Sequence, residues 1–279
     1  MSNELKNMAR DLAMKGYAQS TQKHYLNTAK RLVARFGRAA GSLTQDELRT
    51  YVEEESQTKN VNQLRQELCA LLFLYRRTLA RPDLVSFISL PKTRSTLPEV
   101  LSVKEVHNLL NAIEHPRYQA IAMVMYGCGL RVSEAVALET RDVDGARGII
   151  RVRHGKGDKA REVMLSPELY AWLRQYWSRH QPASPYLFAS SAGKLPTLDT
   201  IRKALRKAAQ AAFIKKRVTP HVLRHSFATH LLEQGTDVHV VGALLGHARL
   251  QTTARYARVT RKLVRQTPSP LDLLPPKRW

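Results

Sequence analysis

A change of pattern at residues 83–100 constrains the fold of this chain more than any other feature. Helical apolar spacing runs up to this stretch, where Pro91 and Pro98 interrupt it and Lys92 and Arg94 add positive charge. Such a stretch is typical of an extended basic linker, either a simple tether or a segment that lies along a polyanion. We therefore expect two domains joined by this linker, although 279 residues could also form one large domain.

Residues 1–82 carry apolar side chains at helical spacing throughout, so we expect a small all-helical domain. Gly16 and Gly37 are placed to end its first two helices. Thr44 and Glu47 have the spacing of a capping box, which predicts that a third helix begins there. The expected helices cover residues 4–15, 20–36, 44–55 and 60–79.

Residues 101–279 mix helical and extended patterns. A β-branched, basic run at residues 149–153 and a second run at residues 161–165 flank a glycine turn at residues 155–158, which predicts a β-hairpin. We expect a mainly α-helical chain with a small β-hairpin or sheet. The other helices are expected at residues 102–113, 118–125, 167–178, 198–212 and 220–234.

The formal charge of +22 is the strongest signal in the composition. Such an excess of Lys and Arg causes self-repulsion unless a polyanion is the partner, so nucleic acid is the first candidate. A membrane surface is the second, although we find no apolar run that could span a bilayer and no N-terminal signal. The alternative is a basic protein whose charges only face water. The apolar fraction of 43% is sufficient for a buried core.

Cysteine and histidine usage argues against a metal site. Cys69 and Cys128 lie among apolar residues without a CxxC pair, which predicts two reduced, buried thiols in a cytoplasmic protein. His221 and His225 are four residues apart and could hold a metal on one helix face, but no third ligand and no HExxH pattern accompany them. We therefore expect no metal.

Two short segments could present guanidinium groups to a phosphodiester. Arg131 follows a Gly-Cys-Gly-Leu turn and shares a helix face with Glu134 three positions later. His221 and Arg224 have the same spacing in a helix that begins near Pro220. Arginine suits phosphate because its planar fork donates two hydrogen bonds and keeps its charge. Taken alone, such pairs are more often a surface salt bridge or a surface arginine beside a packed histidine.

Three further side chains could complete a reaction at phosphorus. Lys156 lies at the tip of the predicted hairpin and could give up a proton there, although a loop lysine more often serves solubility. His247 follows Gly246, and Tyr256 comes nine positions later. A lone tyrosine is usually a core or interface residue. Phenol becomes a useful nucleophile only when its proton is removed or its oxyanion is stabilised, which nearby Arg and His groups could do.

Together these motifs resemble the tyrosine recombinase family, also called phage integrases, and its Xer-like members most closely. The motifs fall in the family's order and at similar separations. The resemblance implies a core-binding, SAM-like N-terminal domain and a mixed α/β catalytic domain that form a C-shaped clamp on DNA. It rests on Gly-Leu-Arg131-x-Ser-Glu134, Gly-Lys156-Gly, His221-x-Leu-Arg224-His225, Leu-Leu-Gly-His247 and Thr-Thr-x-x-Tyr256.

The resemblance also implies a catalytic role for each residue. Tyr256 would attack the scissile phosphate and form a 3′-phosphotyrosine, while Lys156 would protonate the leaving 5′ oxygen. Arg131 and Arg224 would bind the non-bridging oxygens. His221 would hydrogen-bond the phosphate. The remaining catalytic residue would be His247, which would assist at the phosphate or near the tyrosine.

Supporting and binding roles follow in the same way. Glu134 would support the site structurally, and His225 would be a packing or hydrogen-bonding residue. No ATP, metal or other cofactor is implied, because the covalent link conserves the energy of the broken bond. The basic side chains expected to contact DNA outside the site are Lys23, Lys30, Arg31, Arg35, Lys92 and Arg94.

The family usually acts as a homotetramer on two DNA duplexes and exchanges strands through a Holliday junction. Integration, excision and resolution all remain open, as do accessory DNA-bending proteins. Prolines break the tail at residues 262–279, so its leucines could dock on a neighbouring protomer or fold back on their own domain. The alternatives are a type IB-like topoisomerase, a hairpin-forming resolvase and an inactive relative that only binds DNA.

Overall fold

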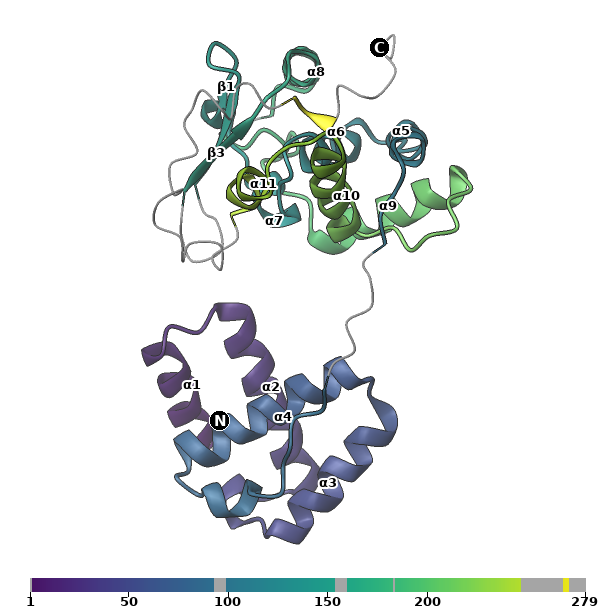
Figure 1. Ribbon diagram of the computed structural model, residues 1–279. Helices are drawn as coiled ribbons and strands as arrows, with labels where there is room; N and C mark the ends of the chain where they lie inside the picture. The colour runs from purple at the N-terminus through teal and green to yellow at the C-terminus, as the bar shows by residue number, and fades with distance from the viewer. Residues whose placement is uncertain (1, 93–98, 154–159, 183, 247–267, 271–279) are drawn as a thin grey trace. The chain divides into compact units, whose positions relative to one another are not determined.

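The computed structural model describes residues 2–92, 99–153, 160–182, 184–246 and 268–270 (Figure 1). The chain forms two compact units, residues 1–96 and residues 97–279, each with a hydrophobic core of its own. In these described ranges, no helix is both long enough and apolar enough to cross a membrane.

The N-terminal unit contains only helices and turns among its described residues, as the apolar spacing predicted. Its elements are α1 (Asn3–Met14), α2 (Gln19–Phe36), a 3-10 turn (Ala40–Ser42), α3 (Gln45–Thr58), α4 (Val61–Phe73), a π-helical turn (Leu74–Thr78) and a second 3-10 turn (Pro82–Val85). Thr44 and Glu47 form the predicted capping box at the start of α3, and Asn60 and Gln63 form a second one at α4. These local hydrogen bonds satisfy backbone N–H groups that a helix start leaves unpaired.

The start of the expected linker belongs to the N-terminal unit. Leu84, Val85 and Ile88 are buried in the core of this unit. Residues 83–88 therefore do not form the extended linker that the nearby prolines suggested, because these apolar side chains anchor them. Residues 93–98 lie outside the described residues.

The C-terminal unit combines helices with a small sheet. Its elements are α5 (Val103–Asn111), α6 (Pro116–Gly127), α7 (Val132–Val136), a 3-10 turn (Thr140–Asp142), β1 (Val143–Asp144), β2 (Ile149–Val152), β3 (Arg161–Met164), α8 (Pro167–His180), α9 (Leu198–Ala211), α10 (Pro220–Glu233) and α11 (Val238–Leu245). The predicted hairpin is confirmed, since β2 and β3 are antiparallel with Ile150 opposite Val163. β1 adds a third antiparallel strand beside β2, and neither β1 nor α11 was predicted.

α6 is the central helix of this unit and is buried along most of its length. α10 packs along α6 (Figure 1). Just after α6, Gly129 has a φ of +64°, and a Cβ atom at this position would lie 2.4 Å from the Phe227 ring of α10. Glycine therefore lets the turn after α6 approach α10 closely. This contact brings the segment that carries Arg131 beside the helix that carries Arg224.

Residues 268–270 lie against the C-terminal unit of the same chain. Ser269 is buried, and its hydroxyl donates a hydrogen bond of 2.7 Å to the carbonyl of Gly127 at the end of α6. Pro270 is buried as well. This short part of the tail thus folds onto its own unit, while the rest of residues 262–279 lies outside the described residues.

Candidate active site

Glu134 is a buried carboxylate at the start of α7 and lies at the centre of the candidate site. Its Oε2 accepts a hydrogen bond of 2.8 Å from the backbone N–H of Arg131, which is the residue that precedes the helix. Its Oε1 accepts a second bond of 2.7 Å from Nη1 of the Arg131 side chain. The spacing of three residues that the sequence indicated therefore produces a direct ion pair, in which Glu134 holds the Arg131 side chain in place.

Arg224 reaches the same carboxylate from α10. This helix begins at Pro220 because the Thr219 side chain accepts a hydrogen bond from the N–H of Val222 at 3.3 Å. Arg224 lies one turn further on and is buried, with Nη1 donating to the Gly129 carbonyl at 2.5 Å and Nη2 donating to the Leu245 carbonyl. Its Nη1 is 3.7 Å from Oε2 of Glu134. The two predicted phosphate-binding arginines thus converge on one carboxylate.

Arg161 is a third arginine in the same cluster, and the sequence reasoning did not single it out. It extends from β3, and its Nη1 and Nη2 donate to Oε1 and Oε2 of Glu134 at 3.0 and 2.7 Å. The available signal was weak: a basic residue on a predicted strand, close to the Lys156 turn. Its partner lies 27 positions away in the sequence, so only the fold brings them together.

The electrostatics of the cluster follow from this crowding. Burial alone would raise the pKa of Glu134, but hydrogen bonds from Arg161 and Arg131 outweigh it and lower the pKa to about 2. Burial, together with the charges of Arg131 and Arg161, lowers the pKa of Arg224 to about 9 against the opposing effect of Glu134. Arg224 is still charged at neutral pH. One carboxylate therefore faces three guanidinium groups, and the cluster retains positive charge that a phosphodiester anion could compensate.

The other predicted catalytic residues are not all described. His221 is exposed in the first turn of α10, one turn before Arg224, and His225 is half-buried on the same helix. The rest, Lys156, His247 and Tyr256, lie outside the described residues, so their positions are not part of this geometry. Among the residues that are described, no group of His, Cys, Asp or Glu has the arrangement of a metal site.

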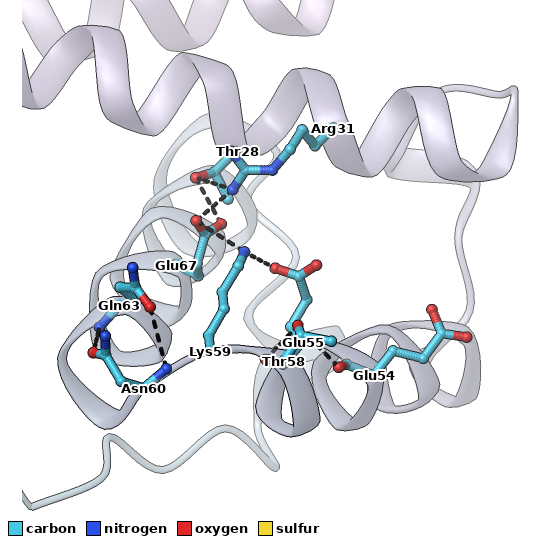
Figure 2. A network of polar contacts seen from close by, with 9 residues as sticks. All are labelled: Thr28, Arg31, Glu54, Glu55, Thr58, Lys59, Asn60, Gln63 and Glu67. Atoms are coloured by element: carbon cyan, nitrogen blue, oxygen red, sulfur yellow. Dashed lines mark hydrogen bonds and ion pairs between the residues drawn. The ribbon is translucent and has the colours of Figure 1, made fainter.

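The predicted DNA-binding residues of the N-terminal unit fall into two classes. Figure 2 shows the first: Arg31 of α2 binds Glu67, a buried carboxylate of α4 that also accepts a hydrogen bond of 2.9 Å from Thr28. Lys59 lies 3.1 Å from the same carboxylate. Arg35 is paired similarly, with Nη2 donating to Glu54 at 3.0 Å.

The second class consists of Lys23, Lys30 and Lys92. Each of these side chains is exposed and makes no ion pair with a described residue. Arg94 lies outside the described residues. Of the predicted DNA contacts in this unit, the lysines therefore present their charge to solvent, whereas Arg31 and Arg35 already have carboxylate partners.

Comparison with known proteins identifies the family. The Phage integrase family matches residues 99–262, and the N-terminal SAM-like domain of phage integrases matches residues 5–83. The chain belongs to the phage integrase family. Its relatives include tyrosine recombinases of the Xer type, so this phage integrase is a tyrosine-type site-specific DNA recombinase.

Individual relatives support this assignment over most of the chain. The integrase is 38% identical to the integrase/recombinase y4qK of Sinorhizobium fredii over 271 residues, which cover 96% of this chain and 88% of the relative. It is 42% identical to the tyrosine recombinase XerD of Proteus mirabilis over 199 residues, or 67% of this chain and 63% of XerD.

Solved structures of integrases have the same fold. A lambda integrase dimer bound to a COC′ core site matches with a TM-score of 0.72 at 16% identity, covering 92% of this chain and 97% of that one. The XerA recombinase matches with a TM-score of 0.52 at 27% identity, covering 94% and 96%. The helical N-terminal unit and the mixed C-terminal unit of this integrase therefore correspond to a known architecture.

Proposed function

We propose that this recombinase cleaves and rejoins DNA through a 3′-phosphotyrosine formed by Tyr256. The observation that carries the proposal is the convergence of Arg131 and Arg224 on Glu134. Two guanidinium groups fixed in one cationic cluster can donate hydrogen bonds to both non-bridging oxygens of a phosphodiester. Such preorganised donors stabilise the charge that builds up as phosphorus is attacked.

The proposed reaction is a transesterification. The phenolic oxygen of Tyr256 passes its proton to water, attacks phosphorus, and forms the new P–O bond while the bond to the 5′ oxygen breaks. Lys156 gives a proton to that leaving oxygen. His221 donates a hydrogen bond to the phosphate, and His247 assists at the phosphate or near Tyr256. Reversal, with a 5′ hydroxyl from another strand as nucleophile, rejoins the DNA without ATP because the phosphodiester energy is conserved.

We propose that strand exchange takes place in a homotetramer through a Holliday junction. Family membership supports this assembly, and a related structure of the same fold is a lambda integrase tetramer bound to a Holliday junction. Accessory DNA-bending proteins would assist in assembling the two duplexes. The DNA substrate fits a protein of the cytoplasm, and so do Cys69 and Cys128, neither of which forms a disulfide.

The test is to trap the covalent intermediate and identify its DNA. The protein is incubated with fragmented genomic DNA, adducts are recovered after denaturation, and the cut ends are sequenced to define the site. We expect Tyr256→Phe to abolish adducts while site binding changes little, because the ring remains and only the nucleophilic oxygen is lost. Adducts that persist in Tyr256→Phe would show that another residue is the nucleophile.

A plasmid assay separates recombination from relaxation. A supercoiled plasmid without the recovered site should stay supercoiled, whereas a plasmid with two copies of the site should recombine. Relaxation of any plasmid regardless of sequence would instead indicate a type IB-like topoisomerase. Binding without adducts on every substrate would indicate an inactive relative.

A further inference from the structure

Arg161 differs from Arg131 in how fully its guanidinium group is engaged. Its Nη1 and Nη2 donate to the two oxygens of Glu134, and its Nε donates to the carbonyl of Leu244 at 2.7 Å. Its side chain is 10% exposed. By contrast, the Arg131 side chain is 22% exposed, and only Nη1 donates to a group within the described residues. Arg131 thus retains donors for a phosphate, whereas all three Arg161 nitrogens point to protein acceptors.

The acceptors of Arg161 lie on two segments that are distant in sequence. Glu134 lies in the first turn of α7, and Leu244 lies in the last turn of α11. The next carbonyl of α11, that of Leu245, accepts from Arg224. Carbonyl groups at the end of a helix lack partners within the helix, so cationic donors there are favourable. The two arginines therefore fasten the end of α11 to the cluster around Glu134.

The end of α11 is also fitted closely to Arg161. Gly246 ends the helix with a φ of +62°, and a Cβ atom at this position would lie 3.3 Å from Cδ of Arg161. In the sequence, His247 follows directly, and Tyr256 comes nine positions later. Arg161 itself lies on β3, five residues after Lys156. It therefore joins β3, which follows Lys156 in the sequence, to the end of α11, which precedes His247 and Tyr256.

We propose that Arg161 is a positioning residue for strand cleavage, an inference that rests on the proposed function above. It contributes no donor to the phosphate. It holds three segments in a fixed relation: the hairpin arm β3, the Arg131 segment through Glu134, and the end of α11 from which the chain continues to Tyr256. Loss of Arg161 should leave DNA affinity unchanged and slow the chemical step, because misplacement of reacting groups by about 1 Å can cost about 100-fold in rate.

Arg161 can be replaced without leaving the buried carboxylate of Glu134 unpaired. Without Arg161, Glu134 still accepts both hydrogen bonds from Arg131 and still has Arg224 nearby, so no buried carboxylate is left without a cation. Two variants test different properties. Arg161→Gln removes the charge, and Arg161→Lys keeps the charge but cannot bridge Glu134 and Leu244 with a planar fork.

The experiment measures single-turnover cleavage of the recovered DNA site. We expect Arg161→Gln to cleave about 100-fold more slowly than wild type, with an equilibrium affinity within about twofold. Arg161→Lys should also be slower, by at least about tenfold, because lysine keeps the charge but lacks the planar fork that bridges Glu134 and Leu244. Arg141→Gln is the control, because Arg141 also pairs with a carboxylate, Glu139, but is 68% exposed. It should cleave at the wild-type rate. A wild-type rate in either Arg161 variant would overturn the proposal.

A substrate with sulfur at the 5′-bridging position separates an effect of Arg161 through Lys156 alone from the wider positioning role. Its leaving group needs no proton, so Lys156→Ala should regain cleavage on it. Arg161→Gln should stay slow, because Arg161 also positions Glu134 and the end of α11. Full recovery of Arg161→Gln would show that it acts through Lys156 alone and would overturn the wider role. If wild type forms Tyr256-dependent adducts, failure here concerns Arg161 and not the proposed function.

Discussion

Glu134 carries its charge inside the protein because three guanidinium groups surround it. Its pKa in the folded chain is about 2, below the reference value of 4.5. Folding therefore favours the ionised form, and this contribution to stability is fully present above pH 4.5 and is lost as the pH falls toward 2. We expect Glu134→Gln to lower the free energy of unfolding by about 3 kcal/mol at pH 7, the cost of breaking a buried ion pair. The deficit should shrink between pH 4.5 and pH 2.

Tryptophan fluorescence during urea unfolding measures this effect in the right part of the chain. The chain has three tryptophans, Trp172, Trp177 and Trp279, and all of them belong to the C-terminal unit. Glu114→Gln is a suitable control, since Glu114 pairs with Lys207 but is 74% exposed, and its removal should not change the unfolding free energy. A pH-independent deficit in Glu134→Gln would mean that lost packing, and not the ion pair, destabilises it.

At the scale of single residues, the spacing of three positions predicted that Arg131 and Glu134 lie close together, although Arg131 precedes α7 and pairs with Glu134 as the residue that caps the helix. The sequence also indicated that Arg224 belongs to the same site, but only through the family resemblance. Arg161 was missed because its contacts join β3 to α7 and α11. No local spacing can encode contacts between segments that meet only after folding.

The packing of α10 against the turn after α6 depends on one glycine. Gly129 combines a φ of +64° with a Phe227 ring that leaves no room for a Cβ atom. Gly235 separates these two effects, because it has a φ of +83° and no neighbour within 4 Å of a Cβ atom. Gly235→Ala should cost about 1–2 kcal/mol for the left-handed backbone alone. Gly129→Ala should cost about 1–3 kcal/mol more, through overpacking against the buried ring.

The same pair of variants connects packing to activity. The Gly129 carbonyl accepts a hydrogen bond from Arg224, so a shift of this turn should slow DNA cleavage in Gly129→Ala. Gly235→Ala should retain the wild-type rate. Urea unfolding followed by tryptophan fluorescence, together with single-turnover cleavage, measures both effects. Equal destabilisation by the two substitutions would contradict the proposed contact with Phe227.

Elements with local signals were predictable, and elements defined by distant partners were not. The capping box at Thr44 fixed the start of α3, and β-branched runs around a glycine turn fixed the hairpin. β1 is only two residues long, and it forms a strand because it pairs with Ile149 and Ile150 of β2. α11 is short and largely apolar, so it has little helical periodicity, although Asp237 caps its start and was an available signal.

At the scale of the whole molecule, the charge of +22 predicts binding that weakens steeply with salt. Each phosphate contact releases counterions and adds about 0.9 to the slope of log affinity against log salt concentration. The charge is not equally available at every position, however. In the N-terminal unit, Arg31 and Arg35 are paired with carboxylates, whereas Lys23 and Lys30 are exposed and make no ion pair with a described residue.

This difference gives a prediction for DNA binding that needs no knowledge of the catalytic step. Lys23→Ala and Lys30→Ala should each reduce the salt slope by about 1, because each lysine is free to contact a phosphate. Arg35→Ala should change it less, since Glu54 already occupies the guanidinium group. Fluorescence anisotropy with the recovered site, measured over a series of salt concentrations in Tyr256→Phe, gives the slopes without cleavage. An Arg35 variant that loses as much slope as the lysine variants would show that its carboxylate partner is exchanged for phosphate when DNA binds.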